Sequence, residues 1–239
     1  MKTDTYLDKI IENKFVEKNK IERENHISSD KLSAGMLNDP LQWQILKILG
    51  VPAKELDEYV LRKFFRGNQI EDWAVSEIPD VIEKQKKVEY KNCIGFADAL
   101  VDTKDWDFKL GIIPVEIKSV ANAKFRRIIN GTGADKGHIL QAGYYALGLE
   151  KEYFAVIYVA SDDLRIKVFI YETKDYKDEI DGIIDKFYAT LKSGMIPIFE
   201  ARESWQSNIK YSKFPFWQEL NEEQLKVKYK ETINNNVAD

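Results

Sequence analysis

The segment Ile112–Val120 constrains the fold more than any other part of the chain, because two charged residues interrupt an otherwise apolar, β-branched run. A run of this kind predicts a strand in a packed sheet. Residues two apart on a strand point to the same face, so Glu116 and Lys118 project together, while Val115 and Ile117 face the other way. Burying charge is costly without partners, so this face of the sheet must supply them.

The rest of the chain predicts one α/β domain around this strand. Apolar residues at helical spacing predict helices at 31–37, 41–49, 55–73, 138–149 and 176–191, with a close contact or a kink at Gly67. Further strands are predicted at 87–90, 94–101, 153–160 and 164–171, the last two as a hairpin, and 121–137 is expected to be a loop. This order favours a mixed sheet flanked by helices. We expect one domain over 28–228, a charged segment at 1–27 and a polar tail at 229–239.

Composition excludes several classes of protein. The net charge of -4 comes from 36 Lys and Arg against 40 Asp and Glu, which excludes a uniformly cationic nucleic-acid coat. Cys93 is the single cysteine, so the chain can form neither a disulfide framework nor a cysteine-based zinc or iron–sulfur site. We find no signal-peptide core and no membrane-spanning run, so we expect a cytoplasmic protein. The high Lys, Asn and Ile content is compatible with a viral origin.

Asp98 is a third charged residue inside a predicted strand. Asp98 and Glu116 could hold Mg²⁺ or Mn²⁺, which prefer oxygen ligands, and the backbone carbonyl of Ile117 could add another. Such an ion would lower the pKa of a bound water, and Lys118 would orient that water beside a phosphate. The alternative is an ordinary cross-strand salt bridge of Lys118 with Asp98 or Glu116.

Three motifs, in order, resemble a known family. They are Gly-Phe-Ala-Asp at 95–98, Val-Glu-Ile-Lys at 115–118, and a predicted helix on which Gln141 and Tyr145 lie one turn apart. This order of G-x-x-D, E-x-K and Q-x-x-x-Y resembles the RecB-type branch of the PD-(D/E)XK nucleases, near the CRISPR-associated exonucleases. The resemblance covers roughly residues 27–171.

The resemblance implies a restriction-endonuclease-like core over about 64–171 that hydrolyses DNA. Its catalytic residues would be Asp98, Glu116 and Lys118, with Gln141 and Tyr145 bordering the centre and meeting DNA. Taken alone, the last two would indicate only a surface helix with a half-buried tyrosine.

A segment upstream agrees with the same family. Phe65–Glu71 resembles its G-x-x-x-E or G-x-x-x-H motif, which implies that Glu71 is an additional metal ligand from the helical layer. The alternative is an exposed helical glutamate beside Asp72.

The chain departs from the family near its C-terminus. Some relatives close the domain with an iron–sulfur cluster whose ligands read C-x-x-C-P-[FY]-x-x-x-C. Tyr211, Phe214 and Leu220 stand at the three cysteine positions here. We infer that hydrophobic packing, aided by Trp205 and Trp217, replaces the cluster; a coincidental aromatic segment is the alternative.

The stretch between Lys118 and the Q-x-x-x-Y helix is locally basic, with only Asp135 opposing its cations, which are Lys124, Arg126, Arg127 and Lys136. Positive side chains beside a carboxylate site fit contacts to the phosphate backbone of DNA. A solvated loop is the alternative. His138, at the start of the helix, is interpreted as a helix cap, a phosphate contact or a catalytic group.

The favoured function is a metal-dependent DNA exonuclease in recombination, repair or replication. A structure- or strand-specific endonuclease is one alternative, and a catalytically idle DNA-binding or assembly subunit of the same fold is another. The intact set of Asp98, Glu116 and Lys118 disfavours the idle subunit. DNA is the expected partner, and a homo-oligomer or a recombination or replication partner protein is compatible with the sequence.

Overall fold

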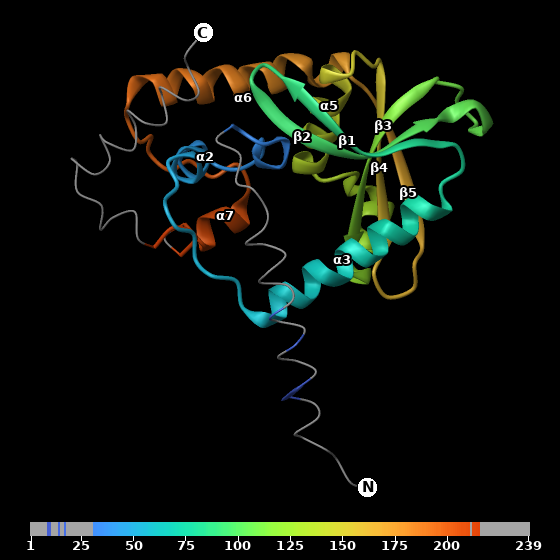
Figure 1. The fold of residues 1–239 in the computed structure, drawn as a ribbon, viewed down its shortest axis with the longest axis horizontal. Coiled ribbons are helices and arrows are strands. Elements are labelled where there is room, and N and C mark those ends of the chain that lie inside the picture. Colours follow the sequence, from blue (N-terminus) through green and yellow to red (C-terminus); the bar gives the residue numbers. More distant parts are fainter. Residues whose placement is uncertain (1–8, 11–13, 15–16, 18–30, 211, 216–239) are drawn as a thin grey trace, which may run out of the picture.

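A five-stranded mixed sheet forms the centre of the computed structural model, which describes residues 9, 10, 14, 17, 31–210 and 212–215 (Figure 1). The strands lie in the order β1 (Val81–Tyr90), β2 (Cys93–Asp102), β3 (Ile112–Val120), β4 (Tyr153–Ala160) and β5 (Ile166–Glu172). β3 and β4 are parallel, and the other neighbours are antiparallel. The predicted α/β fold with a mixed sheet is therefore confirmed. The rest of 1–27 and the whole of 229–239 lie outside the described residues.

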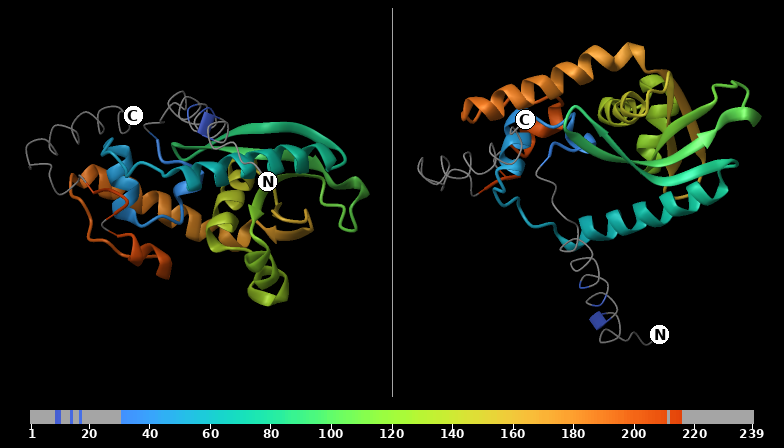
Figure 2. Two further views of the ribbon diagram at one scale, coloured as in Figure 1. Left: turned by 90° about the horizontal axis from the view of Figure 1, so that it is seen from below. Right: turned by 45° about the horizontal axis from the view of Figure 1, so that its top comes forward.

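Helices cover both faces of this sheet (Figures 1 and 2). α3 (Glu58–Glu77) packs its buried side chains Ile70, Ala74 and Val75 against aliphatic residues of β2, β3 and β4. α5 (Lys136–Gly148) lies between β3 and β4 in the chain and covers the other face through Ile139 and Ala142. A long crossover with a helix is what a parallel strand pair requires. The central strand β3 is thus enclosed on both sides.

A helical lobe adjoins the tip of the β1–β2 hairpin. It consists of the 3₁₀ turn η1 (Ala34–Met36), α2 (Leu41–Ile48), α6 (Lys174–Ser193) and α7 (Ser204–Asn208). One apolar cluster joins Trp43 of α2 and Phe187 of α6 to Val88 of β1. Gly95 of β2 permits this approach, since a Cβ there would lie 2.7 Å from the Cβ of Ala34 in η1. No helix in the described part of the chain is both long and apolar enough to cross a membrane.

Two of the predicted segments differ in kind from what is observed. The helix expected at 31–37 is only the short turn η1. The loop expected at 121–137 contains α4 (Asn122–Arg127) and the π-helical turn η3 (Ile128–Thr132). Phe125 and Ile128 explain this helix, because their spacing buries both against β4. β3 and β4 have the predicted bounds, the other predicted helices and strands are present with shifted ends, and β1 begins well before residue 87.

Gly67 also behaves differently from the prediction. α3 runs through it without interruption, and nothing lies within 4 Å of the position that a Cβ would occupy. The expected close contact is therefore absent, and the glycine neither breaks the helix nor packs against another element.

Candidate active site

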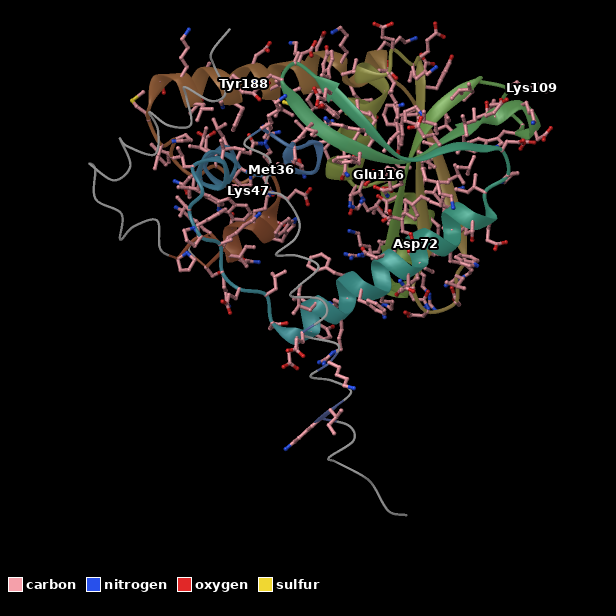
Figure 3. All side chains as sticks on the ribbon, viewed as in Figure 1. Met36, Lys47, Asp72, Lys109, Glu116 and Tyr188 are labelled. Atoms are coloured by element: carbon pink, nitrogen blue, oxygen red, sulfur yellow. The ribbon has the colours of Figure 1, made fainter. Side chains whose placement is uncertain are left out.

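The candidate site lies where β2 and β3 separate. Their backbone pairing ends at Ala99 and Val115, although β2 continues beside β1 and β3 continues beside β4. Just beyond this last pair, Oδ2 of Asp98 on β2 accepts a 2.6 Å hydrogen bond from the backbone N–H of Ile117 on β3. A side-chain carboxylate thus occupies the place of a strand carbonyl, and the two strands diverge beyond it. Figure 3 shows Glu116 beside this divergence.

Glu116 and Lys118 lie on one face of β3, as predicted. They are in register with Val156 and Tyr158 of β4, which pack beneath α5. Glu116 is fully buried, and its carboxylate forms an ion pair with Lys118. Neither carboxylate oxygen of Glu116 has a hydrogen bond to any residue that the structure describes. A buried carboxylate of this kind is costly unless a further partner reaches it.

Glu71 of α3 joins the same cluster. Its Oε1 accepts a 3.0 Å hydrogen bond from Nε2 of Gln85, and its carboxyl group interacts directly with Asp98. The structure therefore brings Glu71, Asp98, Glu116 and Lys118 together. Glu71 is part of this cluster and not the isolated surface residue that the alternative interpretation required.

Burial and crowding shift the pKa values of all four groups. Burial raises the pKa of Glu116 to about 8 against the opposing effect of Lys118. Burial also raises the pKa of Glu71 to about 7, with Asp98 adding to the rise, and it raises the pKa of Asp98. Burial alone would lower the pKa of Lys118, but the neighbouring carboxylates, Glu116 first, bring it above its usual value. One lysine therefore faces three carboxyl groups that it does not fully compensate.

The cluster is not a preformed metal cage. Within the described ranges, no three Asp, Glu, His or Cys side chains are arranged as a metal-binding group. The donor chemistry nevertheless fits a hard cation, because Glu116 has no partner besides Lys118 within the described residues and Asp98 lies across the strand gap. The carboxylates of Glu71, Asp98 and Glu116 would have to rearrange to share one ion.

Gln141 and Tyr145 contact one another on α5. Nε2 of Gln141 donates a 2.8 Å hydrogen bond to the Tyr145 hydroxyl. Tyr145 is buried, and burial together with the nearby Glu116 raises its pKa, so the phenol stays protonated. Tyr145 is thus an interior residue behind the site, whereas Gln141 reaches a cavity.

A cavity of about 600 Å³ opens beside Lys118. Most of its polar lining comes from three places: a catalytic wall on β3 and α5 (Lys118, His138 and Gln141), α4 (Lys124 and Arg127), and a lobe wall contributed by the helical lobe (Asn38, Glu203 and Trp205). The lobe wall was not predicted from the sequence. The carboxylate–lysine cluster therefore adjoins a half-open cavity that a polar ligand could enter.

The four predicted basic residues divide into two groups. Lys124 lines the cavity in an ion pair with Asp135, and Arg127 lines it without an ion pair to any described residue. Lys136 instead pairs with Glu179 of α6, with its Nζ 5.0 Å from the ring centroid of Tyr176.

Arg126 is exposed and does not line the cavity. The structure therefore places two of the four cations, Lys124 and Arg127, at the site.

His138 lies in the catalytic wall but does not cap the helix. The N-cap of α5 is Asp135, and Nδ1 of His138 is 2.7 Å from the hydroxyl of Tyr158. Burial, with Lys118 nearby, lowers the pKa of His138 to about 3, so the ring is neutral at physiological pH. The capping interpretation is therefore wrong, and His138 is a neutral hydrogen-bonding group in the cavity wall.

The aromatic C-terminal segment is described only in part. Phe214 is buried in the cluster of the helical lobe, in keeping with hydrophobic packing at this position. Tyr211, Trp217 and Leu220 lie outside the described residues. Trp205 contributes to the lobe wall and is not fully enclosed in the core.

No family model and no curated protein sequence matches the chain. Solved structures are similar to it. The alkaline exonuclease LHK-Exo from Laribacter hongkongensis has a TM-score of 0.53 at 14% identity, covering 70% of this chain and 90% of that chain. The structure of LHK-Exo in complex with dAMP has a TM-score of 0.54 at 15% identity, and the match covers 76% of this chain and 94% of that chain. The structure of SSO0001 has a TM-score of 0.54 at 16% identity, and the match covers 87% of this chain and 95% of that chain. The likeness shows that the chain shares the fold of these structures, an α/β fold with a mixed five-stranded sheet flanked by helices.

Proposed function

We propose that this chain is a metal-dependent deoxyribonuclease, and an exonuclease in the first instance. One observation carries the proposal: Glu116 is fully buried, Lys118 reaches only its Oε1, Oε2 has no partner within the described chain, and Asp98 lies nearby. A salt bridge with Lys118 alone leaves the second oxygen of Glu116 without a partner. A divalent cation held by oxygen ligands offsets that cost.

The residues divide the work in this proposal. Asp98 and Glu116 hold Mg²⁺ or Mn²⁺, with Glu71 and the Ile117 carbonyl as further oxygen donors. The bound cation supplies an acidic water and offsets negative charge on the phosphate. Lys118 orients the attacking water and lies beside the scissile phosphate.

Residues around the cavity bind the DNA. Arg127 and Lys124 contact phosphates, which positions the strand without reading its sequence. Gln141, held by Tyr145, presents its amide to the same space, and the neutral His138 offers a further hydrogen bond.

Exonuclease action is preferred over endonuclease action for two reasons. The similar protein LHK-Exo is an alkaline exonuclease, and its complex with dAMP contains a single deoxynucleotide. The cavity of about 600 Å³ is also too small to enclose a duplex, which suits the end of a strand better than a continuous double strand. We include in this proposal that the enzyme acts in DNA recombination, repair or replication, together with a partner protein of that process.

A cleavage assay tests the proposal. Linear and circular DNA, single- and double-stranded, would be incubated with Mg²⁺, Mn²⁺ or EDTA. We expect loss of linear DNA only, and only with a cation. Asp98→Asn should be inactive while folded, and Asp178→Asn, which changes an exposed carboxylate on α6, should be fully active. Cleavage of circular DNA would indicate an endonuclease. If the folded protein cleaves no DNA at all, the chain would be the catalytically idle DNA-binding or assembly subunit.

A further inference from the structure

The lobe wall carries an aromatic side chain that the proposed chemistry does not use. Trp205 lines the cavity and is 48% exposed. Its indole is held in place, because Nε1 donates a 2.8 Å hydrogen bond to Oε2 of Glu203. Trp43, buried in the lobe, supports the ring from behind, with the ring centroids 6.3 Å apart. An oriented aromatic surface is therefore left open beside the cavity.

The lobe wall is joined to the rest of the site. Asn38 donates a side-chain hydrogen bond to Glu203, and its backbone carbonyl accepts one of 2.9 Å from Gln206. Gly137, at the start of α5, packs against Asn38, since a Cβ at Gly137 would lie 3.2 Å from Asn38 Cβ. Trp205 thus has a fixed position relative to the catalytic wall.

The other side of the cavity carries cations, of which Lys118 and Lys124 are paired with Glu116 and Asp135. Arg127 also lines it and has no ion pair within the described part of the chain, so its charge is available to a phosphate. A cavity with cations on one side and an aromatic ring on the other matches a nucleotide, whose phosphate is anionic and whose base has a π-face. Bases inside a duplex expose only their edges in the grooves, so stacking on Trp205 requires either an unpaired base or the outer face of a terminal base pair. The volume of about 600 Å³ is in the range of small-ligand sites and cannot enclose a duplex.

We propose that Trp205 is a stacking platform for an unpaired base, so that the pocket selects single-stranded DNA or the frayed end of a duplex. The inference rests on the proposed function for the identity of the polymer. Glu203 and Asn38 act in it as positioning residues, because they hold the indole and touch no substrate.

Binding of a short, fluorescently labelled oligodeoxythymidylate, measured by anisotropy in EDTA, tests the proposal. Trp205→Leu keeps an apolar contact with Trp43 but cannot stack, and should bind about tenfold more weakly. Trp205→Phe should recover most of the affinity. Phe108→Leu is the matched control, because Phe108 is 65% exposed and the adjacent Lys109 is at the far end of the molecule (Figure 3).

An oligonucleotide with abasic residues throughout separates stacking from phosphate contacts. This strand keeps the phosphates but has no bases. The wild type and Trp205→Leu should therefore bind it with the same affinity. An equal loss for Trp205→Leu on the intact and the abasic strand would overturn the proposal, as would wild-type affinity of Trp205→Leu for the intact strand.

Failure of this inference can be distinguished from failure of the proposed function. Cleavage by the wild type together with unchanged binding by Trp205→Leu would refute stacking and leave the nuclease standing. Base-dependent binding through Trp205 without cleavage of any DNA would refute the nuclease and leave the single-strand site standing.

Discussion

The two walls of the cavity are built in different ways. The catalytic wall comes from the enclosed strand β3 and from α5, which packs on it, so that Lys118 and His138 are largely buried. The lobe wall comes from short elements 165 residues apart in the chain, joined by the hydrogen bond of Asn38 to Glu203. Its aromatic residue Trp205 is half exposed.

This difference suggests a division of labour. Groups that must be placed accurately for chemistry are best held by a rigid, well-packed element. Groups that choose among substrates can lie on peripheral elements, where exposure gives access. Substitutions in the catalytic wall should therefore change the rate, and substitutions around the rest of the cavity should change affinity.

The largest effect is expected at Lys118. Lys118→Met keeps much of the apolar stem and removes the charge, so single-turnover cleavage should slow by about 100- to 1000-fold. Affinity for DNA, measured in EDTA, should change only a few-fold, because Arg127 and Lys124 remain. Cleavage by Lys118→Met at the wild-type rate would reduce Glu116 and Lys118 to a structural ion pair and refute the proposed function.

The second effect concerns stability without a metal. Burial raises the pKa of Glu116 from its ordinary 4.5 to about 8. Between these pH values the folded state binds more protons than the unfolded state, so this group's contribution to stability falls as pH rises through that window. Glu116→Gln removes the titration, and should stabilise the metal-free protein at pH 9 by about 1–3 kcal/mol.

The same variant reports on the cation. Lys118 keeps Asp98 and Glu71 as partners, so the substitution does not strand its charge. Thermal unfolding at pH 5 should show little difference between the two proteins. Added Mg²⁺ should raise the midpoint of the wild type more than that of Glu116→Gln, and an equal rise would argue against Glu116 as a ligand.

The catalytic wall was accessible from the sequence because its signals are local. Alternation along one strand placed Glu116 and Lys118 on one face, and helical spacing placed Gln141 one turn from Tyr145. The register of β2 against β3 is not written in either strand alone, so the contact of Asp98 with the Ile117 N–H required the structure.

The lobe wall could not be predicted in the same way. Asn38, Glu203 and Trp205 belong to no periodic pattern, and only tertiary packing brings them to one cavity. The basic stretch shows the same limit: composition identified its cations, but the packing of the unexpected helix α4 and of α5 decides which of them face the site. Arg127 lines the cavity, whereas Lys136 turns to α6.

That contrast yields a smaller prediction. Arg127→Ala should weaken single-stranded DNA binding by about three- to tenfold and reduce the salt dependence of the affinity by about one phosphate contact. Lys136→Ala removes the same charge from the same segment but breaks only contacts with α6, to Glu179 and Tyr176, and should change neither quantity. Equal effects of the two variants would show that net charge, and not the cavity, binds DNA.

The smallest effect is expected from the hydrogen bond behind the catalytic wall. Tyr145→Phe removes the hydroxyl that accepts from Gln141 Nε2 and leaves the packing of the ring intact. If Tyr145 acts by holding Gln141 in the cavity wall, Tyr145→Phe should slow cleavage by only about two- to fivefold, in line with one hydrogen bond of roughly 0.5–1 kcal/mol. Gln141→Ala should slow cleavage at least as much, and the double variant should be no slower than Gln141→Ala, because the two side chains then act as one unit. Unfolding in urea would be measured on all three proteins. Multiplicative losses of rate, or losses that follow stability, would show that Tyr145 serves the core alone and that Gln141 needs no support from it.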